Sequence, residues 1–255
     1  MKVWPIFKKE MRLYFTSPVA YVVFFIFLLI SGYFFSSLFA FFSLTSFQSA
    51  MNPALARDLS VTEGVIRPLF SNVSVILLFL MPMLTMRLLA EEKKSGTIEL
   101  LLTYPIRDGE VLIGKYAAAL TLYASMLGLT ALFPGMVALF AKLDLGPLLT
   151  GYLGLFLLGA AFLAVGILTS SLTENQIVAA FANFGLLLVF WVIGWSADLA
   201  GPGWGKLLSH RSILEHFDNF AKGVIDTKDV IYYLNFTVLC LFLTLRTLES
   251  KRWRG

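Results

Sequence analysis

Charged residues are scarce in this sequence, and cysteine is almost absent. Asp, Glu, Lys and Arg together make up 14% of the 255 residues, whereas an ordinary soluble domain carries roughly 25%. Hydrophobic residues account for 58%, and the mean hydropathy is +0.80. A soluble core cannot bury such an excess, so we expect most of the chain to lie in lipid.

The single cysteine, Cys240, excludes an intrachain disulfide. The net charge of +4 is modest, and in a membrane protein it bears on orientation rather than on nucleic acid. We therefore expect no nucleic-acid partner. The basic start of the chain resembles a signal peptide, but the apolar run behind it is too long and lacks a cleavage pattern, so we expect it to be retained.

Long stretches without Asp, Glu, Lys or Arg define the expected membrane spans. A spanning helix needs about 20 apolar residues, and continuous apolar runs favour helices over the alternating pattern of a membrane barrel. We predict an all-α integral membrane protein, a single domain over 1–255, with six transmembrane helices at 18–43, 68–89, 112–141, 146–171, 175–197 and 229–247. The last run is short, which leaves five spans as the alternative if it lies in the interface.

The distribution of Lys and Arg predicts the orientation. With six spans, thirteen of the 20 basic residues fall on the side that carries both termini, and seven fall on the opposite side. The positive-inside rule therefore places both termini and the loop after the second span in the cytoplasm.

The segment 3–16 precedes the first span and has an amphipathic pattern. Trp4, Phe7, Met11 and Tyr14 share one helical face, and basic residues occupy the other. We expect a short elbow helix lying in the cytoplasmic interface, with a simple basic anchor as the alternative.

The segment 90–109 is more structured than a simple connection requires. Gly96 interrupts the end of the second span, Ser95 or Thr97 can cap a run that ends at Thr103, and Glu99 lies near the positive end of that run. Pro105 stops the run, and Asp108 can cap the third span. The apolar residues Leu100, Leu101 and Leu102 in the same loop require a hydrophobic partner.

The outer segment 198–228 also predicts a helix. Ser212 and Glu215 form a capping box, and Lys222 with Gly223 makes a stop signal. The pattern indicates an amphipathic helix in the outer interface. His210 and His216 match no strong metal-site spacing, so we expect them on an exposed face and predict no metal.

Two motifs resemble catalytic sites but lack essential residues. Residues 109–115 match most of a phosphate-binding loop, but Tyr116 stands where a Ser or Thr should hold magnesium. Glu91 and Glu92 resemble an intramembrane diglutamate protease, but Gly96 replaces the required Arg. We predict no catalytic residue, no cofactor and no enzyme activity in this chain.

The fourth span is rich in small residues, which predicts close helix packing; they are Gly154, Gly159, Ala160, Ala161, Ala164 and Gly166. Asp, Glu, Lys and Arg within a span often mark proton or ion paths. The uninterrupted apolar runs that define the six spans contain none of these residues. If the protein moves a substrate uphill, we expect the energy to enter through the charged cytoplasmic segment.

These residues resemble the permease subunits of type 2 ATP-binding-cassette transporters. The resemblance covers essentially the whole chain and rests on Glu91, Glu92, Gly96, Thr97, Glu99, Leu101, Leu102 and Pro105, followed by Gly114-Lys115 and by residues 170–176. Residues 212–217 and 223–233 are similar to the gliding-motility-type permeases and their relatives in copper-enzyme maturation.

The resemblance implies an ATP-driven exporter in a bacterial inner membrane, with a separate ATPase subunit and a second permease chain, expected to form a homodimer. It implies that 90–109 contains a coupling helix in which Glu91, Glu92, Gly96, Thr97, Glu99 and Pro105 transmit motion and Leu100, Leu101 and Leu102 face the ATPase. The alternative is a membrane anchor or assembly scaffold that recruits a cytoplasmic partner without translocation. The sequence does not specify the substrate.

Overall fold

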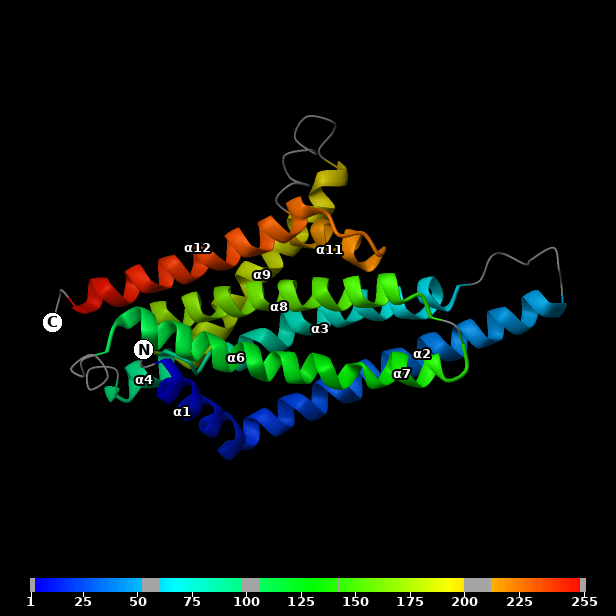
Figure 1. The fold of residues 1–255 in the computed structure, drawn as a ribbon. Coiled ribbons are helices and arrows are strands. Elements are labelled where there is room, and N and C mark those ends of the chain that lie inside the picture. The colour runs from blue at the N-terminus through cyan, green and yellow to red at the C-terminus, as the bar shows by residue number, and fades with distance from the viewer. Residues whose placement is uncertain (1–2, 52–59, 98–105, 142, 200–211, 253–255) are drawn as a thin grey trace.

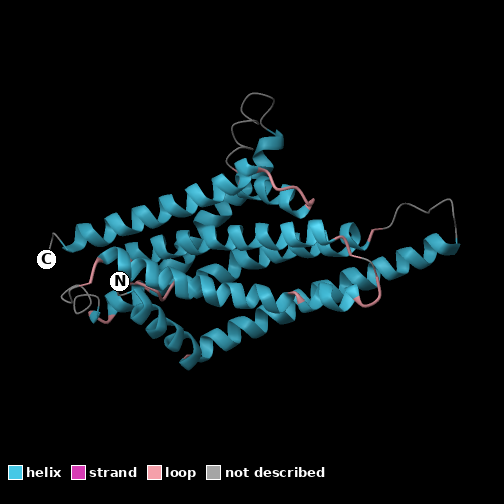
Figure 2. Ribbon diagram, viewed as in Figure 1, coloured by secondary structure: helices cyan, strands magenta, loops and turns pink. Residues whose placement is uncertain are grey.

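The structure, a computed structural model, describes residues 3–51, 60–97, 106–141, 143–199 and 212–252. Within these ranges every regular element is a helix (Figure 2). Six helices are long and apolar enough to cross a membrane: Pro18–Met51, Thr62–Lys94, Asp108–Ala138, Leu145–Leu172, Gln176–Ile193 and Thr227–Ser250. The predicted fold class is confirmed, and the sixth of these helices in the described part of the chain meets the length that a span requires.

The helices form an elongated bundle with both termini at one end (Figure 1), as an even number of spans requires. This end is called the terminal end below. In chain order the helices are α1 (Val3–Thr16), α2 (Pro18–Met51), α3 (Arg67–Thr85, after a π-helical turn at Thr62–Ile66), α4 (Ala90–Lys94), α6 (Asp108–Thr130), α7 (Leu132–Ala138), α8 (Leu145–Leu172), α9 (Gln176–Leu199), α11 (Ile213–Ala221) and α12 (Thr227–Arg252).

Several span boundaries differ from those predicted. Helix α2 has 34 residues, about 51 Å at the usual rise, and it extends past the neighbouring helices in Figure 1. The third span breaks after Thr130. Pro134 explains that break, because its ring would clash with the carbonyl of residue 130 and it has no N–H to donate.

Helix α1 occupies the range expected of the elbow helix, and it packs against α6 and α2. Ile6 and Glu10 are buried, whereas Trp4 and Phe15 are exposed. Gly114 of α6 permits this contact, because a Cβ there would lie 2.8 Å from Ile6. Placement of α1 in a membrane interface stays a prediction.

Helix α8 lies at the centre of the bundle, and its small residues provide the predicted close contacts. A Cβ added to Gly154 would meet Phe220 at 2.5 Å, and one added to Gly166 would meet Thr85 at 2.1 Å. Only glycine allows neighbouring backbones and side chains to come this near. The predicted packing role of this helix is confirmed.

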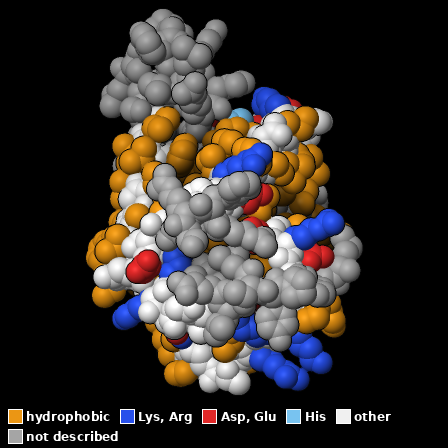
Figure 3. All heavy atoms as spheres, turned by 90° about the vertical axis from the view of Figure 1, so that its left-hand side faces the viewer, with side chains coloured by type: hydrophobic (Ala, Val, Ile, Leu, Met, Phe, Trp, Pro, Cys, Tyr) orange, Lys and Arg blue, Asp and Glu red, His pale blue; other side chains and the backbone are white. Residues whose placement is uncertain are grey.

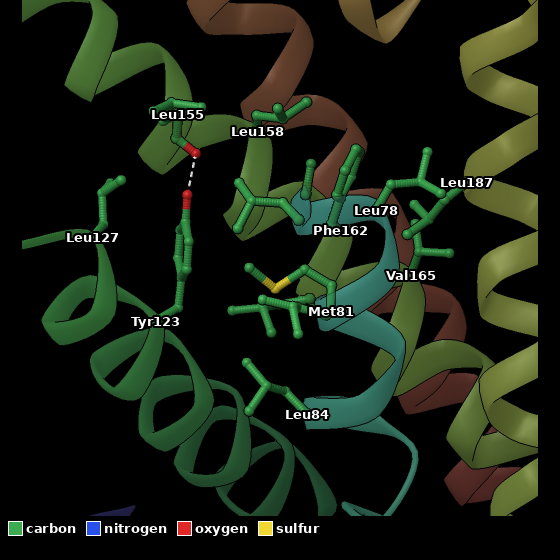
Figure 4. Close-up of a cluster of buried hydrophobic side chains, with 14 of the residues drawn as sticks. Leu78, Met81, Leu84, Tyr123, Leu127, Leu155, Leu158, Phe162, Val165 and Leu187 are labelled. Carbon is green, nitrogen blue, oxygen red and sulfur yellow. Dashed lines mark hydrogen bonds between the residues drawn. The ribbon is translucent and has the colours of Figure 1, made fainter. Parts of the chain in front are cut away.

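The core between α3, α6 and α8 consists almost entirely of apolar side chains (Figure 4). Tyr123 is the large polar exception and is fully buried. Its hydroxyl donates to the carbonyl of Leu155 at 2.5 Å. The bond satisfies a phenol that would otherwise be costly to bury, so it fixes α6 against α8.

Helix α11 forms as predicted, but its burial corrects one expectation. Ser212 caps it by accepting the N–H of Glu215, and Gly223 follows its end with a φ of +89°. His216, expected on an exposed face, is buried and lies 2.6 Å from a carboxylate oxygen of Asp229. The reason is tertiary: α11 packs its apolar face onto α8, and the start of α12 folds beneath it.

The contact at Gly159 yields a stability prediction. Gly159→Ala places a methyl group 2.3 Å from the buried Tyr123 ring, so we expect it to lower the free energy of unfolding by about 1–3 kcal/mol. Gly185→Ala on α9 is the matched control, because nothing lies within 4 Å of its added Cβ. Thermal unfolding of the two purified variants tests this, and equal midpoints would contradict it.

Candidate functional site

The terminal end of the bundle carries a cluster of four charged side chains, which we call the charge cluster: Lys9, Glu10, Glu92 and Lys115. They come from three segments that are distant in sequence, namely α1, α4 and the start of α6. Figure 3 views the molecule onto this end, where basic and acidic side chains are visible beside apolar flanks.

Lys115 holds the cluster together. Its ammonium nitrogen lies 2.8 Å from an oxygen of Glu10 and 2.9 Å from an oxygen of Glu92, and its side chain is 1% exposed. Glu10 and Glu92 are also largely buried, whereas Lys9 is about half exposed. The two carboxylates offset the cost of burying the ammonium group of Lys115.

Lys9 completes the cluster from the solvent side. Its nitrogen lies 2.9 Å from the same oxygen of Glu92 and 3.6 Å from Glu10. Burial lowers the pKa of Lys9, but the carboxylates of Glu92 and Glu10 outweigh this effect, so its pKa is raised. Two ammonium groups and two carboxylates therefore form a neutral cluster that links α1, α4 and α6.

The opposite side of α4 is bonded to α8. The hydroxyl of Ser170 accepts the N–H groups of Leu89 at 3.1 Å and Ala90 at 3.0 Å, and it donates to the carbonyl of Met86 at 3.1 Å. These backbone groups belong to the turn that separates α3 from α4. One serine side chain thus uses its donor and both acceptor positions to satisfy a break in the second span.

Lys93 adds a second bond to α8. Its ammonium group donates to the carbonyl of Ser171, and the side chain is buried. Helix α4 has only five residues, too few to be stable alone. It is held in place by α1 and α6 on one side and by α8 on the other.

Four of the residues predicted for coupling lie in this region. Glu91 accepts two hydrogen bonds from Arg87, at 2.7 and 3.0 Å, and Glu92 joins the charge cluster. Gly96 has a φ of +71°, which confirms the predicted break. The hydroxyl of Thr97 turns back to the carbonyl of Glu92 at 3.4 Å and so helps to close α4.

The remaining predicted residues, Glu99, Leu100, Leu101, Leu102 and Pro105, lie outside the described residues. Asp108 was predicted to cap the third span, but it is the first residue of α6, and the cap position is Arg107. The side chain of Glu110 accepts the N–H of Arg107 at 3.5 Å.

Sequence reasoning gave no role to Glu10, and it named Lys115 and Ser170 only among the residues that carry the family resemblance, without their contacts. A signal existed for Glu10, since it falls on the same helical face as Ile6 and Tyr14 although it carries a charge. None existed for Ser170, because its role depends on where another span breaks. Among the described residues, no group of three or more His, Cys, Asp or Glu could hold a metal ion.

The charge cluster predicts a strong and asymmetric response to substitution. Lys115→Ala removes the buried cation from Glu10 and Glu92 and leaves them paired with the half-exposed Lys9, so we expect a loss of about 3 kcal/mol in the free energy of unfolding, the lower end for a broken buried ion pair. Adding Glu10→Gln should restore part of that loss. The measurement is denaturant unfolding in detergent, with Lys228→Ala at an exposed ion pair as the control. A double variant no more stable than Lys115→Ala alone would contradict the prediction.

The bonds of Ser170 predict a local change in dynamics. Ser170→Ala should accelerate amide hydrogen exchange at Leu89 and Ala90 by roughly fivefold, since a hydrogen bond contributes about 1 kcal/mol. Ser171→Ala is a close control, because within the described ranges that hydroxyl bonds to its own helix, at the carbonyl of Leu168. Mass spectrometry of exchanged peptides measures both, and equal exchange in the two variants would refute the assignment.

Comparisons with known proteins agree with this architecture. The probable ABC transporter permease protein NosY of Pseudomonas aeruginosa is 32% identical over 123 residues, which cover 44% of this chain and 44% of that relative. The chain thus matches less than half the length of NosY. The family model described as ABC-2 family transporter protein matches residues 4–253. The chain is a multi-pass membrane protein that belongs to the ABC-2 transporter family.

Proposed function

We propose that this chain is the membrane-spanning subunit of an ATP-driven exporter and that ATP is hydrolysed by a separate ABC ATPase rather than by this chain. Membership of the ABC-2 family supports an ATPase partner. The observation that carries the coupling proposal is the bonding of α4, which is tied at once to α1, α6 and α8.

Force applied to residues 90–109 would enter the bundle through α4. The Glu92 carboxylate would pass the displacement to Lys115 on α6 and to Lys9 on α1. The bonds of Ser170 and Lys93 would pass it to α8, the central helix. Because packed helices move between discrete arrangements rather than deform continuously, such a push shifts the population between two packings of the bundle.

The same function requires a binding site for the ATPase, an orientation in the membrane and a second permease chain. The ATPase binds at the terminal end, with Leu100, Leu101 and Leu102 facing it, and that end is cytoplasmic. The excess of Lys and Arg on that side supports this orientation in a bacterial inner membrane. Two copies of the chain pair with two ATPase subunits.

A charge reversal in the coupling segment tests the proposal. In the assembled complex, Leu139→Cys places a reporter at the far end of the bundle, where Leu139 is 80% exposed, and Cys240→Ala removes the native thiol. We expect ATP to change the reactivity of the reporter toward a membrane-impermeant maleimide. Glu99→Lys should abolish that ATP response because it disturbs the ATPase-facing segment, while the unfolding temperature should stay nearly unchanged.

Glu249→Lys serves as the control, since Glu249 lies at the terminal end but in α12 and pairs with Arg246. It should keep the ATP response. A full response in the Glu99→Lys complex would argue against coupling through this segment.

A further inference from the structure

A cavity of about 440 Å³ lies between α1, the start of α2, the end of α3 and α4. It adjoins the charge cluster, and its volume falls within the range of small-molecule sites, roughly 300–1,000 Å³. The mechanism of coupling proposed above does not use this space.

The cavity lies where the bundle passes from apolar to charged surface. Leu13 and Phe15 at the end of α1 and Tyr21 and Phe25 at the start of α2 are exposed apolar or aromatic side chains. All four residues of the charge cluster line the cavity. Exposed aromatic residues next to such a boundary are typical of the headgroup region of a membrane, so we expect this end of the bundle to lie at the lipid headgroups, and Leu13 belongs both to this surface and to the cavity lining.

The lining contains the two kinds of side chain that a phospholipid would contact. Val19, Ala20, Met83 and Leu84 provide an apolar wall, and Met83 is 39% exposed. Lys9, Arg87, Glu91 and Glu92 provide a charged wall. The first can pack against glycerol and the upper acyl chains, and the second can bind a polar headgroup.

Arg87, on the charged wall, has N–H donors that its contacts with the described residues do not use. Arg87 uses its Nε and Nη2 groups on Glu91 and its Nη1 on Ser17 at 3.3 Å. A guanidinium has five N–H donors, so two remain among the contacts of the described residues. Lys9 is about half exposed. A phosphate group between Arg87 and Lys9 would receive charge-assisted hydrogen bonds.

The same wall has a spare acceptor. Both Lys9 and Lys115 contact Oε1 of Glu92, whereas its Oε2 is buried and has no hydrogen-bond partner among the described residues. A buried carboxylate oxygen in this state favours a donor. With Lys9, Arg87 and Lys115 balanced by Glu10, Glu91 and Glu92, the cavity is neutral, which suits a zwitterion better than an anion.

We propose that this cavity binds a phospholipid whose headgroup carries a phosphate and a primary ammonium, as phosphatidylethanolamine does. Arg87 and Lys9 hold the phosphate, and the ammonium donates toward Glu92. A choline headgroup has no N–H to donate, and a glycerol headgroup has no positive charge. The assignment concerns the isolated chain and does not depend on an ATPase.

Thermal unfolding of the purified full-length protein in detergent tests the assignment. The additions are dioleoyl phosphatidylethanolamine, phosphatidylcholine or phosphatidylglycerol, and free phosphoethanolamine. We expect the ethanolamine lipid to raise the midpoint by several degrees more than the other two lipids, because a ligand stabilises only the state that binds it. Free phosphoethanolamine should have little effect, since it lacks the chains that contact the apolar wall.

Two variants test whether the preference for the ethanolamine lipid arises in the cavity. Arg87→Gln removes the phosphate donor, and Met83→Trp fills the apolar side without changing charge; each should abolish the difference between ethanolamine and choline lipids. Arg246→Gln is the matched control, because Arg246 also pairs with a nearby glutamate at the terminal end but lies outside the cavity. It should keep the difference.

The readout is a difference between lipids within one variant, so a general loss of stability does not imitate it. Equal stabilisation of the wild-type protein by the three lipids would overturn the proposal, as would preference for the glycerol lipid. A preference retained by Arg87→Gln would also overturn it. If free phosphoethanolamine raised the midpoint as much as the ethanolamine lipid does, the ligand would be a soluble molecule, and the lipid proposal would be wrong.

Discussion

The arrangement of the terminal end depends on one buried ammonium group. Lys115 is almost completely inaccessible, and Glu10 and Glu92 both lie within 3 Å of its ammonium nitrogen. Leaving such a group without partners costs several kcal/mol. The position of α6 therefore fixes where α1 and α4 must lie, and the three segments behave as one body.

This constraint explains how the five-residue helix α4 keeps its position in the bundle. Helix α4 has too few residues to hold its own shape, and the second span is broken immediately before it. Its stability comes from side chains of its neighbours, chiefly the carboxylate–ammonium contacts on one side and the Ser170 hydroxyl on the other. A displacement of α4 must therefore either move those neighbours or break bonds in a buried environment.

Much of the fold followed from the sequence because membrane insertion is governed by local composition. Uninterrupted apolar runs gave six helices, and the small residues of residues 145–172 gave the central helix its close contacts. Helix ends were less predictable, because Pro134 breaks a span that composition alone would continue. The stop at Gly96 was predictable, since few other residues adopt a φ of +71° without strain.

The sequence by itself determined the fold class, the number of spans and the presence of a structured charged segment, because each depends on residues that are neighbours along the chain. Only the tertiary structure decided that Lys115 meets Glu10 and Glu92, that Ser170 completes the break before α4, and that His216 is buried rather than exposed. The physical reason is the same in each case. A buried polar group must find a partner, and the sequence does not say which distant segment folding will bring to it.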